Sequence, residues 1–236
     1  MTWNLAPNSV PKKFRDPAWH HLLDPEGLDA DVALVQEAIQ PDWLDEQHHV
    51  HWRRSWPEPG PIWGTGIVTK KRFSLEPIFR DVPDTRFVMA RLTTNTAEFL
   101  VVSIHAFTTM DPAYFSDRRS LRFIDRLQAN FDAIRDDCTD RFIVGGDLNS
   151  GRIAESTWPS HGHEAFWAAL DEAGFHSCPW SSTREEVTTY THPSGPFAGQ
   201  ADHVLLDATT ALGATTAVPD LPAPLSDHLP LVVDLP

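Results

Sequence analysis

The chain has 236 residues, of which 41% are hydrophobic, so it is long enough to bury the core of one large domain and does not have a disordered composition. Its 33 acidic and 19 basic residues give a net charge of −14. This charge disfavours tight, sequence-independent binding along a nucleic-acid backbone, because such binding needs many Lys and Arg side chains. Nucleic-acid chemistry is not excluded, since a bound divalent cation inverts the charge of an acidic cleft locally.

The two cysteines, Cys138 and Cys178, form no metal or redox motif. We expect free, buried thiols in a reducing compartment, although a single disulfide also fits the sequence. No apolar run reaches the length of a membrane-spanning helix, and the N-terminus lacks the charged and apolar regions of a secretory signal. The sequence therefore predicts a cytoplasmic protein with no membrane contact and no obligate protein partner.

The first elements place polar residues at the ends of predicted strands. Residues 2–5 form a short strand that contains Asn4, a helix begins near Asp16, and residues 31–37 form a buried strand that ends in Glu37. Open α/β sheets place ligand groups at such strand ends, which makes Glu37 a candidate metal ligand. The alternatives are a surface position for the glutamate and an ordinary turn role for the asparagine.

Residues 40–64 are rich in Pro, His and Trp, a composition that favours a loop or a pair of edge strands over a helix. Arg53 and Arg54, together with the aromatic rings, are candidates for binding an anionic, heterocyclic substrate. A loosely packed aromatic lid is an equal alternative. A zinc hydrolase built on the histidines of residues 48–51 is a further alternative, and it needs another carboxylate or His at fixed geometry.

The middle of the chain contains a predicted hairpin and a predicted helix. Residues 64–69 form a strand, and residues 87–92 and 98–104 form the two strands of the hairpin. The second of these strands ends at His105, where a core or capping role competes with a catalytic one. Apolar residues recur every three or four positions in residues 117–137, which predicts an amphipathic helix.

Residues 141–150 are the stretch around which the rest of the chain is organised. A short apolar run predicts a buried strand, and Gly145 and Gly146 allow another backbone to approach closely. If the chain stays extended, Asp147 and Asn149 point the same way. Asp147 could then take a proton from a water, while Asn149 donates a hydrogen bond to the group that the water attacks. The alternative is a strand followed by an Asx turn.

The remaining elements complete what we interpret as a single domain of residues 1–236. A helix over residues 163–173 is followed by a hairpin, with strands at residues 188–191 and 203–206. A final strand occupies residues 231–235.

Carboxylates, amides and imidazoles gather at the predicted strand ends, as metal-assisted phosphoester hydrolysis requires. These residues are Asn4, Glu37, His105, Asp147, Asn149, Asp202, Asp227 and His228. The segments that carry them are Trp3-Asn4, Gln36-Glu37, Ser103-Ile104-His105, Gly146-Asp147-Leu148-Asn149, Ala201-Asp202-His203-Val204 and Ser226-Asp227-His228-Leu229-Pro230. In order and form they resemble the endonuclease/exonuclease/phosphatase superfamily, which includes pancreatic-type deoxyribonucleases, abasic-site endonucleases, sphingomyelinases, inositol-polyphosphate 5-phosphatases and deadenylases.

The resemblance implies an α/β fold, a four-layer α/β sandwich with two mixed β-sheets packed face to face and helices outside. It also implies that the enzyme uses Mg²⁺, with Mn²⁺ able to substitute. Glu37 would be the main metal ligand, with Asn4 and Asp227 close to the metal or to its waters.

The resemblance assigns roles to the other residues as well. Asp147 would activate the attacking water, and Asn149 would bind the phosphate. His228, held by Asp202, would contact a non-bridging phosphate oxygen, and His105 would assist on the leaving-group side.

The sequence departs from the abasic-site branch of this superfamily. His105 stands at the strand end where that branch keeps a tyrosine, Ala6 replaces an acidic residue, and Ala201-Asp202-His203 replaces the more usual Ile-Asp-Tyr. These changes argue against a dedicated abasic-site enzyme and leave the hydrolytic residues intact.

We therefore expect a Mg²⁺-dependent phosphoester hydrolase, either a nuclease or a phosphodiesterase or phosphatase. The net charge favours a small or single-stranded substrate, such as single-stranded nucleic acid or a nucleotide, over long duplex DNA. The alternatives are a small-molecule phosphomonoesterase and a catalytically silent binding or scaffold protein on the same fold.

Overall fold

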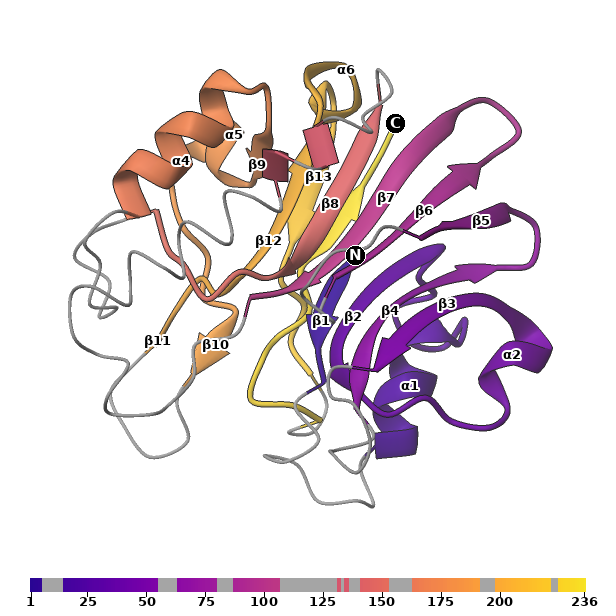
Figure 1. Cartoon of the computed structure of the whole chain (residues 1–236). Coiled ribbons are helices and arrows are strands. Elements are labelled where there is room, and N and C mark those ends of the chain that lie inside the picture. Colours follow the sequence, from indigo (N-terminus) through magenta and orange to yellow (C-terminus); the bar gives the residue numbers. More distant parts are fainter. Residues whose placement is uncertain are drawn as a thin grey trace.

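Two mixed β-sheets lie face to face in the computed structural model of the chain, with helices on their outer faces (Figure 1). This arrangement is the α/β sandwich predicted from the sequence. The structure describes residues 1–5, 15–54, 63–79, 87–106, 131–132, 134–135, 141–152, 163–191, 198–221 and 225–236.

The first sheet has four strands in the order β1-β2-β4-β3. Their bounds are β1 Thr2–Asn4, β2 Val32–Ala38, β3 His48–Arg54 and β4 Gly64–Lys70. Strands β1 and β2 are parallel, and the other pairs are antiparallel. For residues 40–64 the prediction of a loop or a pair of edge strands is confirmed only for β3, which is an edge strand. The expectation of no helix there is wrong, because residues 44–47 form the four-residue helix α2, Leu44–Gln47.

The second sheet has six strands in the order β5-β6-β7-β8-β12-β9. Their bounds are β5 Ser74–Ile78, β6 Phe87–Thr93, β7 Glu98–His105, β8 Phe142–Asp147, β12 Asp202–Leu206 and β9 His176–Cys178. Strands β6 and β7 form the predicted hairpin. Strands β7 and β8 are parallel, which makes this sheet mixed as well.

The predicted pairing of residues 188–191 with residues 203–206 is wrong. Strand β10, Tyr190–Thr191, pairs with the two-residue strand β11, Ala198–Gly199. Strand β12 instead lies between β8 and β9. Every residue of β12 is buried, so this run needs a neighbour on each side, which a hairpin with a short exposed strand would not supply.

Three apolar layers hold the sandwich together. Leu34 and Ile67 of the first sheet pack against Val101, Ile143 and Val204 of the second, between the two sheets. A second cluster lies between the outer face of the first sheet and helix α1, Arg15–Leu23. A third lies between the second sheet and helix α4, His163–Glu172. That residues 1–236 form a single domain stays a prediction.

The helices agree with the sequence where the structure describes them. Helix α4 ends before Gly174, which has a φ of 85° and so forms the predicted glycine stop. Of the helix predicted over residues 117–137, only residues 131–132 and 134–135 are described, and these four are helical. Phe131 and Ile134 are buried, as an inward apolar face requires.

The remaining elements are short. They are helices α5, Trp180–Thr183, and α6, Ala208–Ala211, and a two-stranded sheet of β13, Thr215–Ala217, and β14, Val232–Asp234. Cys178 is a free, buried thiol, whereas Cys138 lies outside the described residues. Within the described part of the chain, no helix has the length and apolar character needed to cross a bilayer.

Candidate active site

The predicted polar residues meet at one edge of the sandwich because the strands that carry them end there. Asn4 ends β1, His105 ends β7 and Asp147 ends β8. In the second sheet His105 is opposite Asp147, and Asp147 is opposite Asp202, the first residue of the antiparallel strand β12. In the first sheet Asn4 is opposite Gln36, the residue before Glu37.

Glu37 reaches the site because strand β2 is irregular at that point. The register of β2 against β4 shifts between Val35 and Ala38, and Glu37 has a φ of 45°. In a regular strand Gln36 and Glu37 would point to opposite faces. Here Gln36 donates to Ser103 of β7, in the facing sheet, at 2.9 Å, and Glu37 contacts His105 of β7 as well. The bulge therefore turns both side chains toward the second sheet.

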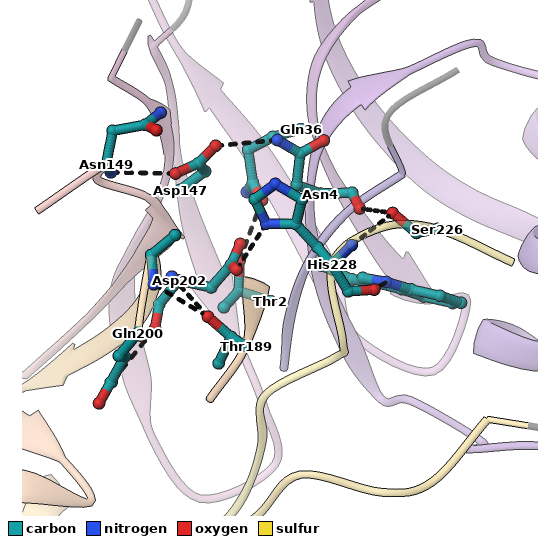
Figure 2. A network of polar contacts seen from close by, with 12 residues as sticks. Thr2, Asn4, Gln36, Asp147, Asn149, Thr189, Gln200, Asp202, Ser226 and His228 are labelled. Carbon is teal, nitrogen blue, oxygen red and sulfur yellow. Dashed lines mark hydrogen bonds and ion pairs between the residues drawn. The ribbon is translucent and has the colours of Figure 1, made fainter. Parts of the chain in front are cut away.

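Asn4 links the two acidic residues of the site. Its Nδ2 donates to Asp147 Oδ2 at 2.9 Å and to Glu37 Oε1 at 3.3 Å. Ser226 in turn donates to the backbone carbonyl of Asn4 at 2.7 Å and accepts from the backbone N–H of His228 (Figure 2). The predicted role of Asn4 near the metal stays a prediction, and only its Oδ1 could serve as a ligand atom.

His105 lies on the acidic side of the site with its ring almost fully buried. Its Nε2 is 3.2 Å from Glu37 Oε1 and 3.9 Å from Asp147 Oδ2. The hydrogen bond from His105 helps to keep the pKa of Glu37 below its ordinary value, although burial, the largest single influence, raises it. Glu37 therefore stays a carboxylate in the folded protein near neutral pH.

Asp147 is 2% exposed, and burial raises its pKa from 3.8 to about 6, with the positive charge of His228 opposing and the negative charge of Asp202 adding to the shift. A carboxyl group with this pKa is ionised at neutral pH and is well matched to accept a proton from water.

The extended conformation assumed for the segment after Asp147 is wrong. Asn149 has a φ of 47°, and its backbone N–H donates to Asp147 Oδ1 at 3.0 Å, which is the Asx turn considered as the alternative. The side-chain Nδ2 of Asn149 donates to the carbonyl of Ala106 at 2.8 Å, next to His105. The turn thus orients Asp147 through one oxygen and brings the Asn149 amide back to the end of β7.

His228 and Asp202 form a buried ion pair, with His228 Nδ1 2.8 Å from Asp202 Oδ2 (Figure 2). Burial disfavours the charged ring, but Asp202 above all, together with the negative charges of Asp147 and Asp227, raises the pKa of His228 from 6.5 to about 10. The ring is therefore an imidazolium at neutral pH. Its Nδ1–H is held by Asp202, so Nε2 is the other N–H donor of the ring.

Thr189 and Tyr190, which the sequence predicted in a strand but not at the site, support this pair. The hydroxyl of Thr189 accepts from the backbone N–H groups of Ala201 and Asp202, each at 3.0 Å. The ring of Tyr190 lies 4.7 Å from the ring of His228, centroid to centroid. The only signal for these contacts was the Thr-Tyr-Thr strand itself, whose neighbours in space could not be read from the sequence.

The loop after Asn149 is held by two ring N–H groups that the sequence also did not identify. His203 Nε2 donates to the carbonyl of Ser150 at 2.7 Å, and Trp167 Nε1 donates to the carbonyl of Gly151 at 3.0 Å. Burial lowers the pKa of His203 to about 4, so its ring is neutral, and its Nδ1 accepts from Gln200. The histidine that replaces the more usual tyrosine therefore holds the backbone of the loop at Ser150.

Arg53 and Arg54 lie at the same edge of the first sheet as Glu37. Arg54 is opposite Gly64 of β4, and Gly64 is opposite Ala38, the residue after Glu37. Strand β4 therefore lies between the two arginines on β3 and Glu37 on β2. Their predicted contact with substrate stays a prediction.

The donor set fits a divalent cation. Within the described part of the chain, the one group of His, Cys, Asp and Glu side chains close enough to share an ion is Glu37, His105 and Asp147, whose ligand atoms lie within 4.8 Å of one another. Asp227 adds a buried Oδ1 that has no hydrogen-bond partner among the described residues. The histidines of residues 48–51 belong to no such group in the described ranges, so the zinc alternative gains no support.

Comparison with known proteins identifies the fold and the family. No curated protein matches the sequence, but several solved structures share the fold at low identity. One is the endonuclease domain of TRAS1, a telomere-specific non-LTR retrotransposon, with 16% identity, a TM-score of 0.64, and 99% of this chain and 96% of the other covered.

Two others are TDP2 proteins. Truncated Caenorhabditis elegans TDP2 has 14% identity and a TM-score of 0.68, with 99% of this chain and 95% of the other covered. D. rerio TDP2 complexed with single strand DNA product has 17% identity and a TM-score of 0.62, with 97% and 94% covered. The sequence profile of the Endonuclease/Exonuclease/phosphatase family matches residues 1–228. The chain therefore belongs to the Endonuclease/Exonuclease/phosphatase family.

Proposed function

We propose that this protein hydrolyses phosphoesters with the help of a divalent cation. The observation that carries the proposal is the position of Asp147, a buried carboxylate with a pKa of about 6. Asp147 lies between Glu37, His105 and Asn4 on one side and the His228–Asp202 ion pair on the other. This arrangement brings together a carboxylate that can take a proton from water, a candidate cation site and a fixed positive charge, all at the edge of the sandwich where the strands end.

Each residue has a distinct task in the proposed reaction. Asp147 takes a proton from the attacking water, since its pKa suits that transfer. His228 donates from Nε2 to a non-bridging phosphate oxygen, and Asp202 keeps the ring charged. Asn149 has a second amide N–H, besides the one used by Ala106, for the phosphate.

A divalent cation, when bound, supplies positive charge that polarises the phosphoester and lowers the pKa of a bound water. Glu37 would hold it, with Asn4 and Asp227 close by. The choice of Mg²⁺, with Mn²⁺ able to substitute, stays a prediction from the family resemblance.

For the substrate, we infer a small or single-stranded phosphodiester. The net charge of −14 disfavours a long duplex, and D. rerio TDP2, a protein of the same fold, was solved with single strand DNA product. A phosphomonoesterase is the second candidate, because the site residues described above serve either type of ester.

The test is hydrolysis of single-stranded oligonucleotide, supercoiled plasmid, bis-p-nitrophenyl phosphate and several phosphomonoesters by the wild-type protein and by Asp147→Asn. Asp207→Asn is a matched control, since Asp207 is also a buried aspartate at a strand end, where it accepts hydrogen bonds from the backbone N–H groups of Thr210 and Phe142. We expect cation-dependent turnover that Asp147→Asn abolishes and Asp207→Asn retains. Equal turnover in the wild-type protein and Asp147→Asn would exclude Asp147 as the base.

A further inference from the structure

The two arginines at the end of β3 lie on opposite faces of the first sheet. Strand β3 pairs with β4 in continuous register over its whole length, so its side chains alternate between the two faces. The ring of Trp52 lies on the outer face, 6.4 Å from the ring of Trp19 in helix α1, centroid to centroid. Arg54, two residues further on, therefore belongs to the outer face, and Arg53 belongs to the inner face, which is turned toward the second sheet.

Arg53 shares the inner face with His51. His51 is opposite Ile67, which packs between the two sheets, and its ring lies 5.4 Å from the ring of Phe79, the residue after β5. Burial and, after it, the positive charge of Arg53 lower the pKa of His51, so the guanidinium is close to this ring. Arg53 and Phe79 therefore flank His51 between β3 and β5, the neighbouring edge strands of the two sheets (Figure 1).

Arg53 lies at the same edge of the sandwich as the proposed hydrolytic residues, but at a distance from them. It is opposite Thr65 of β4, and the residues on either side of Thr65 pair with those that flank the bulge of β2. Arg53 and Glu37 are therefore two strands apart, with roughly 10 Å between their backbones. Asp147 contacts Asn4 of β1, one strand further from Arg53. The arginine is thus placed to bind a group beside the cleaved phosphate rather than the cleaved phosphate itself.

Phe79 adds an exposed aromatic ring on the facing sheet. It follows the end of β5 that pairs with the active-site end of β6, and it is 83% exposed, whereas Phe is most often buried. A ring beside a cationic side chain suits a single-stranded nucleic acid, because bases stack on aromatic rings and phosphates attract positive charge. On a chain with a net charge of −14, this pair is a local exception. A simple phosphomonoester has no base to stack and no second phosphate to bind.

We propose that Arg53 and Phe79 form a subsite for the nucleotide next to the cleaved phosphodiester of a single-stranded nucleic acid, and that Arg54 has no part in it. The inference rests on the proposed function and narrows its substrate class to oligonucleotides. Arg53 binds the neighbouring phosphate, and Phe79 stacks on the base of that nucleotide. Because every base can stack, the subsite selects single strands and not a sequence.

The experiment measures the Kd of a fluorescein-labelled single-stranded oligonucleotide by fluorescence anisotropy, in Mg²⁺ and over a range of salt concentrations. The full chain carries Asp147→Asn in every sample, so that the oligonucleotide is not cleaved. Arg53→Gln and Phe79→Ala are each added to this parent. The matched controls are Arg54→Gln, which removes the same charge from the outer face, and Leu212→Ala, which removes an apolar side chain that is 78% exposed. Circular dichroism checks that each variant is folded.

We expect Phe79→Ala to raise Kd by at least roughly fivefold, which is the lower end of what one stacked base contributes. Arg53→Gln should raise Kd at low salt and should reduce the slope of log Kd against log salt by about 0.7, the contribution of one phosphate contact in a single strand. Arg54→Gln and Leu212→Ala should retain the Kd and the slope of the parent.

Equal Kd values and slopes for Arg53→Gln and Arg54→Gln would overturn the inference, as would equal Kd values for Phe79→Ala and Leu212→Ala. A parent that binds no single-stranded oligonucleotide would overturn it as well. Weaker binding by Arg53→Gln and Phe79→Ala, without hydrolysis of any ester by the wild-type protein, would support the subsite and contradict the proposed function. Hydrolysis by the wild-type protein, with no change of Kd in these two variants, would retain the function and reject the subsite.

Discussion

The ion pair of His228 and Asp202 makes a specific prediction about pH dependence. A change in pKa from 6.5 to about 10 corresponds to roughly 5 kcal/mol of preferential stabilisation of the charged ring. Most of this stabilisation comes from Asp202, since burial opposes it and the contributions of Asp147 and Asp227 are smaller. Asp202→Asn keeps a hydrogen-bond acceptor for Nδ1 and removes only the charge, so we expect the pKa of His228 to fall to 6.5 or below.

The consequence for catalysis follows from the fraction of charged ring. With a pKa of about 6.5, only about one His228 in thirty is protonated at a pH of about 8, whereas the wild-type ring is almost fully protonated there. We expect kcat/KM of Asp202→Asn to be at least roughly thirtyfold lower at that pH. On the acid side both proteins lose activity as Asp147, whose pKa is about 6, becomes protonated.

The assay is kcat/KM for a phosphoester that the wild-type protein hydrolyses, measured from a pH of about 5 to about 10. Above the acid limb set by Asp147, the wild-type profile should be flat until the alkaline limb near 10, whereas that of Asp202→Asn should fall above about 6.5. Asp207→Asn, next to the other end of the same strand, should lower stability by about 1 kcal/mol, because Asn has only one oxygen to accept from the backbone N–H groups of Thr210 and Phe142, and should leave the profile unchanged. An alkaline limb of Asp202→Asn that coincides with the wild-type limb would refute the reasoning.

Substitutions at three further positions test other parts of the site. Gly146→Ala should lower the free energy of unfolding by about 3 kcal/mol or more, because the new Cβ would collide with the backbone of Ile104, and an unchanged denaturation midpoint would contradict this close approach. Glu37→Ala should raise the metal concentration needed for half-maximal activity by roughly tenfold or more, and an unchanged metal dependence would place the cation elsewhere. His203→Phe should lower kcat, because it removes the donor to the carbonyl of Ser150. His203→Gln retains a donor and should retain most of kcat. Equal kcat values for the two variants would show that the contact with Ser150 does not position the site.

The candidate site could be predicted from the sequence because its residues follow buried apolar runs. Strand ends of parallel pairs meet at one sheet edge, so Asn4, Glu37, His105 and Asp147 were expected together, and the structure brings them together. The His228–Asp202 contact came from the family resemblance, since no local pattern links two residues on separate segments.

What the sequence could not show depends on contacts between distant segments. The bulge that turns Glu37 toward His105 has no sequence signature, because a glutamate with positive φ is rare and is held by the surrounding sheet. Strand β5 was missed because its burial pattern is mostly exposed, with little apolar alternation. The support of the Ser150 carbonyl by His203 is likewise a contact across 53 residues, which local spacing does not encode.

The most direct test of the central claim is phosphoester hydrolysis by the wild-type protein and Asp147→Asn after chelation and after addition of Mg²⁺ or Mn²⁺. The account predicts that the wild-type protein loses turnover on chelation and recovers it with the cation, while Asp147→Asn remains folded and inactive under every condition. Turnover that survives chelation, or that Asp147→Asn shares, would contradict a cation-assisted reaction in which Asp147 is the base.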